Sequence, residues 1–280
     1  MTSEAREGFY TSGVPQAEIN RLGKFTYPDE VSVELLSDSV SQRKVLDVGA
    51  GSSPRLGKWI ESQGGEYVAL DVAPELISGL RKNAGILGIV FNEIVRGRIQ
   101  TLPFRDKSID VSHARFVLMH LPPGDRASAI QELLRVSSQR VYIMEWNWRT
   151  MTSKANPQEI GEFKELQYDL AELFGVDLNM GEGLDELVRK TVETTGQKYE
   201  ISVKPESRSE DDYTKDIEGL CEMAIGKLSM FLQDERATSR FGKERLQNLL
   251  SGFNAFLTRI KESPIKFVPP EIVIATIEKK

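Results

Sequence analysis

A glycine-containing turn directly after an apolar run constrains the fold of this chain more than any other feature. Residues 45–54 read Val-Leu-Asp-Val-Gly-Ala-Gly-Ser-Ser-Pro, a pattern typical of a buried strand that enters a ligand-binding turn. Gly49 and Gly51 carry no Cβ, so the backbone can turn sharply there and approach a ligand closely. Ser53 can cap the following helix, and Pro54 suits the first turn of that helix. The pattern predicts the opening strand, turn and helix of a nucleotide-type cofactor site.

Apolar runs and helical patterns alternate along the rest of the chain. The apolar runs predict strands at 43–48, 67–71, 89–95, 109–112, 140–146, 198–204 and 271–278. Amphipathic patterns between most of these runs predict helices, for example at 125–136. Because this alternation implies right-handed crossovers, we expect an α/β fold with a Rossmann-like, doubly wound sheet of seven mostly parallel strands.

The chain divides into three parts in this interpretation. An N-terminal helical cover, a cofactor-binding core and a C-terminal part of the same domain are predicted at residues 1–42, 43–148 and 149–280. The third part contains a helical insertion at about 208–263 and then the final strand. Two long amphipathic helices are expected in the insertion, beginning near Tyr213 and Leu246. Their apolar faces are either buried within one chain or form a homodimer interface, and both readings stay open.

Composition and charge narrow the class of partner. With 28% charged residues and a net charge of −6, the chain is poorly suited to bind a nucleic-acid backbone as its main partner. It has no run of about 18 apolar residues, and residues 1–24 lack the apolar core of a secretory signal, so no membrane association is expected. The single cysteine, Cys221, excludes an intrachain disulfide framework and is compatible with the cytoplasm. We therefore expect a cytoplasmic protein whose main partner is not a nucleic acid.

An acid follows the second predicted strand at an informative distance from the glycine turn. Asp71 lies 20 residues after Gly51. At this spacing an acid meets the ribose hydroxyls in dinucleotide-type folds. The pairing of turn and acid is more specific than the glycines alone.

Further short motifs follow in order along the chain. They are the acid in 69–71, Leu-Pro-Phe at 102–104 leading to Ile-Asp-Val at 109–111, and Val-Leu-Met-His-Leu-Pro at 117–122. Together with the glycine turn, they closely resemble the motifs of class I S-adenosylmethionine (SAM) dependent methyltransferases, in particular the small-molecule branch called type 11. The resemblance covers about residues 43–148.

The resemblance implies a SAM site on the glycine turn. Gly49 and Gly51 would face the methionine part of SAM, and Asp71 would accept hydrogen bonds from the ribose hydroxyls. Alignment on residues 102–104 places Ile99 beside the adenine and Arg98 where the family usually has an acid. The cofactor-binding residues are expected to be Asp47, Gly49, Ala50, Gly51, Asp71, Val72, Arg98, Ile99, Ala114, Arg115, Tyr10 and Arg21. Of these, Tyr10 and Arg21 would close the site from the N-terminal cover, with Arg21 near the SAM carboxylate.

Three other functions remain as alternatives. Ser53 stands at the third glycine position and Pro54 follows it, which makes a poor cradle for a pyrophosphate and disfavours an NAD-dependent dehydrogenase. Arg98 at the usual acidic position motivates a SAM-binding regulatory protein without turnover. An RNA methyltransferase is disfavoured by the acidity of the chain.

Candidate catalytic and substrate residues lie near the ends of the fourth and fifth predicted strands. Methyl transfer is an in-line displacement, so a base is needed only when the acceptor must lose a proton. His113, His120 and Glu145 are the candidate bases, and each has a structural alternative. Trp146 and Trp148 form either a wall of the substrate pocket or part of the core. No spacing of histidine, cysteine and carboxylates suggests a metal site, so no metal is expected.

Overall fold

The computed structural model describes most of the chain. Residue 10 and residues 13–24, 27–91, 93–207 and 214–280 are described. Parts of three predictions lie outside them: sections of the N-terminal cover, position 92 of the third predicted strand, and the start of the insertion with Tyr213.

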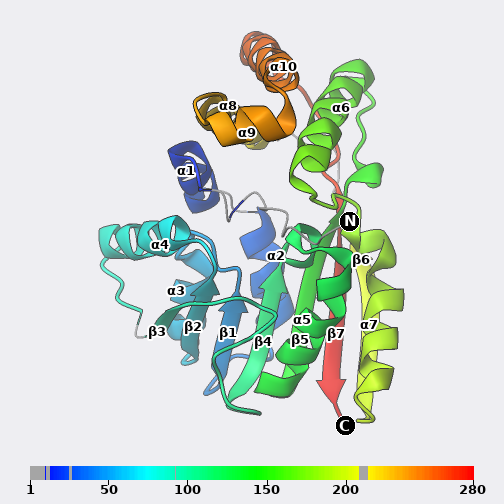
Figure 1. Cartoon of the computed structure of the whole chain (residues 1–280). Coiled ribbons are helices and arrows are strands. Elements are labelled where there is room, and N and C mark those ends of the chain that lie inside the picture. Colours follow the sequence, from blue (N-terminus) through cyan, green and yellow to red (C-terminus); the bar gives the residue numbers. More distant parts are fainter. Residues whose placement is uncertain (1–9, 11–12, 25–26, 92, 208–213) are drawn as a thin grey trace.

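A seven-stranded sheet in the order β3-β2-β1-β4-β5-β7-β6 forms the centre of the molecule (Figure 1). The strands are Lys44–Val48 (β1), Glu66–Asp71 (β2), Glu93–Arg96 (β3), Ile109–Arg115 (β4), Ser137–Asn147 (β5), Tyr199–Glu206 (β6) and Glu271–Lys279 (β7). From β3 to β5 the neighbours pair in parallel, whereas β7 is antiparallel to both β5 and β6. The predicted α/β fold with a mostly parallel, seven-stranded sheet is confirmed.

Helices cover both faces of this sheet. The longer helices of the core are α2 (Tyr27–Leu36), α3 (Arg55–Ser62), α4 (Pro74–Ile86), α5 (Pro123–Val136) and α7 (Leu184–Thr194). Successive residues of a strand point to opposite faces, so Leu46 and Val45 belong to different apolar cores, Leu46 to the larger and Val45 to the smaller. Residues of α2, α3 and α4 complete the smaller core, and residues of α5 and α7 the larger. Burial on both faces explains why the parallel strands are almost continuously apolar.

The start of the third predicted strand and the expected helix cap at Ser53 differ from the structure. The third strand begins at Glu93 and not at residue 89, because the Ile89 N–H donates to the Ala84 carbonyl at 2.9 Å and so closes the end of α4. Pro54 and not Ser53 is the N-cap residue of α3; the Ser53 hydroxyl donates to Asp29 at 3.1 Å and accepts the Arg55 N–H at 3.5 Å. Ile89 thus belongs to the end of α4, and the Ser53 hydroxyl bonds to a residue of α2.

Five helices gather beyond one end of the sheet (Figure 1). They are α1 (Gln16–Lys24), α6 (Pro157–Phe174), α8 (Thr214–Leu232), α9 (Glu235–Phe241) and α10 (Lys243–Glu262). A Cβ on Gly219 of α8 would lie 2.9 Å from Cγ of Arg21, and one on Gly226 would lie 3.1 Å from Cβ of Pro15. The two glycines therefore allow α8 to approach α1 closely, which joins the N-terminal segment to the insertion.

The described part of the predicted insertion contains three helices, where two were predicted. The short α9 is capped by Asp234, whose carboxylate accepts hydrogen bonds from the N–H groups of Arg236 and Ala237. The apolar residues of α8 and α10 belong to the larger core, so these faces are buried within the chain. The homodimer stays a prediction. None of the helices in the described ranges is long and apolar enough to cross a membrane.

Candidate active site

A cavity of about 600 Å³ lies between the sheet and the helices gathered at its end. Its lining includes Asp71 at the end of β2, Gly49 after β1, Phe116 after β4, Trp148 after β5 and Phe267 before β7. Neighbouring strands lie about 4.8 Å apart, so the cavity spans about 19 Å of the sheet edge from β2 to β7. Ligands of open α/β sheets bind at this edge, beyond the carboxyl ends of the strands.

The glycine turn forms the part of the cavity wall above β1. Gly49 and Gly51 have φ angles of 72° and 64°, which side chains with a Cβ rarely adopt. The N–H groups of Gly49 and Ala50 donate to the Leu70 carbonyl at 2.8 and 3.1 Å and so tie the turn to β2. The turn therefore presents backbone to the cavity, with nothing larger than a methyl group on residues 49–51.

We expect Gly49→Ala to destabilise the turn. A Cβ at this position would lie 2.5 Å from Cγ2 of Val117, and alanine is strained at the positive φ. The free energy of unfolding should fall by about 1–3 kcal/mol. Urea denaturation measures the loss, with Gly124→Ala as the matched control because a Cβ there meets open space. An unchanged stability in the Gly49 variant would contradict the tight contact.

Asp71 holds the turn from the neighbouring strand. Its Oδ2 accepts a hydrogen bond from the Gly51 N–H at 3.0 Å, and its Oδ1 accepts one from the Ala73 N–H at 2.9 Å. Burial raises the pKa of Asp71 above its ordinary value, against the lowering effect of these backbone bonds. Each carboxylate oxygen can accept a second hydrogen bond, so both keep capacity for hydroxyl groups in the cavity. This arrangement fits the ribose of SAM.

At the expected adenine end of the site, Arg98 replaces the acid of the family motif, and another residue supplies a carboxylate. Arg98 is exposed, whereas Ile99 is buried and contributes apolar surface to the cavity. The carboxylate of Asp125, in the first turn of α5, also lines this end and accepts a hydrogen bond from Nε2 of Gln100 at 3.2 Å. An apolar wall with an acceptor beside it fits a purine that carries an amino group.

Asp47 and His113 lie beneath the glycine turn and are not part of the cavity lining. The Asp47 carboxylate has Oδ1 at 2.9 Å from Nδ1 of His113 and accepts a hydrogen bond from the Tyr67 hydroxyl at 2.9 Å. On its other side, Nε2 of His113 lies 3.1 Å from the Ser32 hydroxyl. These partners hold His113 in the core, which agrees with a structural role and not with a catalytic one.

Glu145 is also buried outside the lining of the cavity. Its Oε1 accepts a hydrogen bond from the Leu118 N–H at 2.6 Å, and its Oε2 has no hydrogen-bond partner among the described residues. Burial raises the pKa of Glu145 to about 8. Through Leu118 the carboxyl group fixes the short helix η1 (Leu118–His120), which forms part of the cavity wall.

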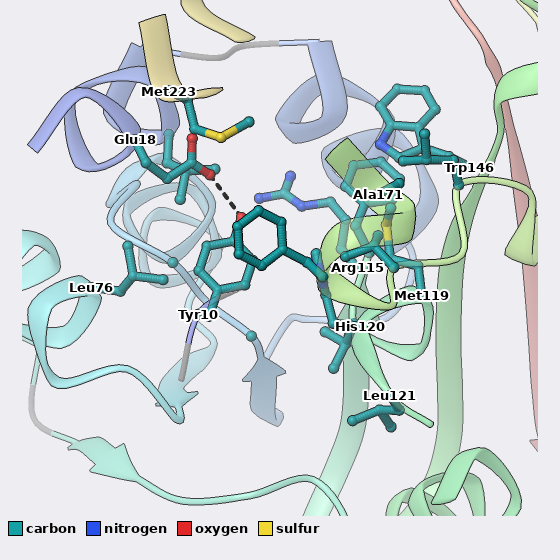
Figure 2. Close-up of a pocket in the computed structure, with 18 of the residues that line it drawn as sticks. Tyr10, Glu18, Leu76, Arg115, Met119, His120, Leu121, Trp146, Ala171 and Met223 are labelled. Carbon is teal, nitrogen blue, oxygen red and sulfur yellow. Dashed lines mark hydrogen bonds between the residues drawn. The ribbon is translucent and has the colours of Figure 1, made fainter. Parts of the chain in front are cut away.

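His120 is the candidate base that lines the cavity. Its ring stands edge-on to the Tyr10 ring, with centroids 4.9 Å apart (Figure 2). Its Nδ1 is buried without a hydrogen-bond partner in the described part of the protein. Burial lowers the pKa of His120 to about 4, so the imidazole is neutral at pH 7 and can accept a hydrogen bond or a proton.

The N-terminal cover contributes a buried carboxylate to the same region. Glu18 accepts a hydrogen bond from the Tyr10 hydroxyl at 2.7 Å (Figure 2) and two from Arg21 at 2.7 and 2.9 Å. The Glu18 carboxylate compensates the charge of Arg21, so a contact between Arg21 and a cofactor carboxylate stays a prediction. A second ion pair joins the partly buried Arg115 to the buried Asp29 at 2.7 Å.

Aromatic rings dominate the opposite end of the cavity, above β5 and β7. The Phe116 and Trp146 rings are stacked with centroids 4.3 Å apart. Trp148 follows β5, and both tryptophans are buried and line the cavity. Gln167 joins them from α6.

The structure brings most of the predicted site residues to one cavity. Those that line it are Tyr10, Arg21, Gly49, Ala50, Gly51, Asp71, Val72, Arg98, Ile99, Arg115, His120, Trp146 and Trp148. Those that do not are Asp47, His113, Ala114 and Glu145. The sequence interpretation missed Glu18, Asp125 and Gln167. One signal for Gln167 was available: it is a polar residue that lies, by helical spacing, on the apolar face of α6.

The described residues contain no group of three or more histidine, cysteine or carboxylate side chains that could hold a metal ion. Cys221 is buried in α8, and burial raises the pKa of its thiol to about 12. The thiol therefore stays protonated at neutral pH and is a poor nucleophile.

Comparison with known proteins finds a family that the central part of this chain resembles. Residues 46–144 match the family described as a methyltransferase domain. An uncharacterised 37.1 kDa transposon protein of Streptomyces fradiae is 29% identical over 152 residues, which are 51% of this chain and 43% of that protein. This match thus spans less than half of the length of that relative.

Two solved structures share the fold. A proposed methyltransferase from an antibiotic biosynthesis pathway of Anabaena variabilis has a TM-score of 0.56 at 14% identity, covering 91% of this chain and 98% of its own. Phosphoethanolamine N-methyltransferase 2 of Haemonchus contortus, in complex with phosphomonomethylethanolamine and S-adenosylhomocysteine, has a TM-score of 0.54 at 15% identity, covering 99% of this chain and 59% of its own. The fold of the chain, the match of residues 46–144 to a methyltransferase domain and the position of Asp71 beside the glycine turn agree with one another, so the central part of this chain is similar to a methyltransferase domain.

Proposed function

We propose that this protein transfers the methyl group of SAM to a small organic acceptor at an oxygen, nitrogen or carbon atom. One observation carries the proposal: a single cavity connects the glycine turn and Asp71 to the aromatic end at Trp146 and Trp148. A cofactor on the first end and an acceptor on the second would meet near Phe116, above β4. In-line transfer needs this alignment more than it needs a dedicated base.

In this proposal, different residues bind the cofactor, close the cavity and accept the proton. The glycine turn and Asp71 hold and orient the cofactor, which supplies an activated methyl group when it is bound. Tyr10 and Glu18 close the cavity from the N-terminal cover and exclude water. His120 accepts the proton of an acceptor that must lose one, such as a hydroxyl group. Arg21 contacts the cofactor carboxylate only if its pair with Glu18 rearranges.

Location, partners and domain organisation belong to the same proposal. The single cysteine supports a cytoplasmic location. The net charge of −6 supports a small-molecule acceptor over a nucleic acid. We keep residues 43–148 as the SAM-binding core, with the N-terminal cover and the insertion completing one domain.

Calorimetric titration with SAM, followed by measurement of S-adenosylhomocysteine release, tests the proposal. The acceptor panel consists of small phenols, amines and activated methylene compounds, with total RNA as a separate arm. SAM binding with turnover on a small acceptor supports the proposal. SAM binding without any turnover favours a regulatory protein, turnover on RNA alone favours an RNA methyltransferase, and absence of SAM binding contradicts all three.

Asp71→Asn should weaken SAM binding while the protein stays folded. The amide keeps the size of the side chain but turns an N–H₂ donor toward one of the backbone N–H groups of Gly51 and Ala73. We expect the Kd for SAM to rise about 30-fold, since two charge-assisted hydrogen bonds to ribose are weakened. The matched control is Asp110→Asn, because Asp110 also accepts a backbone N–H, from Lys44 at 2.9 Å, but does not line the cavity. Equal Kd values for the two variants would remove Asp71 from the cofactor site.

A further inference from the structure

Two ion pairs neutralise arginines of the cavity lining. Arg21 pairs with Glu18, whose carboxylate also accepts a hydrogen bond from the Tyr10 hydroxyl. Arg115 pairs with Asp29, which lies outside the lining. Each of these arginines therefore has a carboxylate of its own.

The other charged residues of the lining are Arg98, Asp71, Asp125 and Asp216. Arg98 is exposed and follows β3 at the adenine end. The carboxylate of Asp71 accepts two backbone N–H groups, and that of Asp125 accepts the amide of Gln100. Asp216 differs from these two acids, because its carboxylate forms no hydrogen bond or ion pair with any residue in the described ranges.

Asp216 is half-buried and lies on the face of α8 that lines the cavity. It precedes Leu220 and Met223 by four and seven positions, so the three residues form one stripe along the helix, and all three line the cavity. Figure 2 shows Met223 on the same side of the cavity as Glu18. Burial raises the pKa of Asp216 to about 6, against the lowering effect of the nearby Arg21 guanidinium. The carboxylate is therefore mostly ionised at pH 7, and Arg21, the cation beside it, already pairs with Glu18.

The negative charge of Asp216 lies on the glycine-turn side of the cavity. A Cβ on Gly219, one helical turn after Asp216, would lie 2.9 Å from Cγ of Arg21. The next residue of α1, Leu22, has its Cδ1 atom 3.5 Å from the position of a Cβ on Gly51. The start of α8, helix α1 and the glycine turn are thus in contact one after the other. This contact brings Asp216 to the end of the cavity where the amino-acid part of SAM is expected.

The amino-acid part of SAM carries an α-ammonium group, which S-adenosylhomocysteine keeps. An ammonium group is a compact cation with three N–H donors, and it forms charge-assisted hydrogen bonds with carboxylates. We propose that Asp216 binds the α-ammonium group of the cofactor. This inference rests on the proposed function, because it requires the cofactor to lie on the glycine turn. It makes α8 a part of the cofactor site, whereas all the cofactor contacts predicted from the sequence lie before residue 148.

Ligands with and without the ammonium group test the assignment. They are S-adenosylhomocysteine, its des-amino analogue, in which hydrogen replaces the ammonium group, and 5′-methylthioadenosine, which lacks the whole amino-acid part. Isothermal titration of the full chain gives the Kd of each ligand for the wild type and for Asp216→Asn, which keeps the size of the side chain and removes its charge. We expect the substitution to raise the Kd of S-adenosylhomocysteine about tenfold and to leave the other two Kd values unchanged.

Glu218→Gln is the matched control. Glu218 lies in the same helix and loses the same charge, but it does not line the cavity, so this variant should bind all three ligands as the wild type does. Asp216 also lies in the first turn of α8, where an acid stabilises the helix. Loss of that structural effect would weaken every ligand alike, so the comparison of ligands separates the two roles.

Three results would overturn the proposal. The first is an equal loss of affinity for all three ligands in Asp216→Asn. The second is an unchanged Kd of S-adenosylhomocysteine, which would leave the charge for a cationic acceptor. The third is a loss confined to SAM, which would assign the carboxylate to the sulfonium group.

Failure of the proposed function gives a different result from failure of this inference. A wild type that binds neither SAM nor S-adenosylhomocysteine contradicts the proposed function. If the wild type and Asp216→Asn bind S-adenosylhomocysteine equally well, only the role of Asp216 is contradicted.

Discussion

Replacement of His120 by glutamine is expected to lower kcat about 100-fold for an acceptor that must lose a proton, while SAM affinity stays unchanged. A positioned base contributes about 10²–10⁴-fold, and a base of lowered pKa lies at the weak end of that range. His120 lines the cavity, and its buried Nδ1 has no hydrogen-bond partner among the described residues. Burial lowers its pKa to about 4, so the imidazole is unprotonated and ready to accept the proton at pH 7. Steady-state kinetics with a phenolic acceptor measures the effect.

Acceptors of different acidity separate proton transfer from a structural effect of this substitution. A phenol already ionised at the assay pH has no proton to lose, so its kcat should change little in the His120 variant. A structural role would lower kcat for ionised and neutral phenols alike, which is the contradicting outcome. Leu118→Met is the control, because Leu118 lies in the same short helix but outside the cavity lining.

The cofactor half of the site could be predicted because its signals are local. Two glycines after an apolar run indicate a turn, and Asp71 follows Gly51 at a spacing set by one helix and one strand. Such patterns depend on residues that are close in the sequence and on the backbone conformation that these residues favour. The observed φ angles of Gly49 and Gly51 agree with that reasoning.

The assignment of the two histidines depended on where β4 ends. The sequence predicted a strand that stops at residue 112, which left both His113 and His120 after it. β4 continues to Arg115, so His113 lies inside the strand, paired in register with Asp47 of β1. The side chain then points into the core and not into the cavity. The end of a strand is determined by its hydrogen-bond pairing with neighbouring strands, and the sequence of one strand alone does not reveal this pairing.

The substrate half of the site was less predictable because it is assembled from distant segments. Trp148 was recognised by its place after a strand, but Gln167 lies on a helix that contacts it only through the packing of α6 on the short helix η2 (Trp148–Thr150). Glu18 illustrates the same limit, since its burial results from the approach of α1 to α8. Tertiary packing decides whether such polar residues face solvent, each other or a ligand.

Glu145→Gln is expected to remove a large pH dependence from the stability of the protein. The pKa of Glu145 is raised to about 8 from an ordinary value of 4.5, chiefly by burial. Between these values the unfolded chain releases a proton that the folded protein keeps. The contribution of this group is therefore fully present below pH 4.5 and is lost as the pH rises to about 8. The upper bound of the loss is about 5 kcal/mol, at 1.36 kcal/mol per pKa unit.

Glutamine keeps the oxygen that accepts the Leu118 N–H and carries no titratable proton. Relative to the wild type, we expect the variant to gain stability between pH 5 and pH 8, as measured by urea denaturation at both values. His120 titrates with the opposite sign, because its lowered pKa makes stability fall as the pH drops below 6.5, but this effect is common to both proteins and cancels in the difference. The exposed Glu165→Gln on α6 is the control and should follow the wild type. If stability depends on pH in the same way in the wild type and in Glu145→Gln, the carboxyl group is already ionised in the folded protein at these pH values. The Leu118 N–H would then be held by a charged carboxylate and not by a neutral carboxyl group.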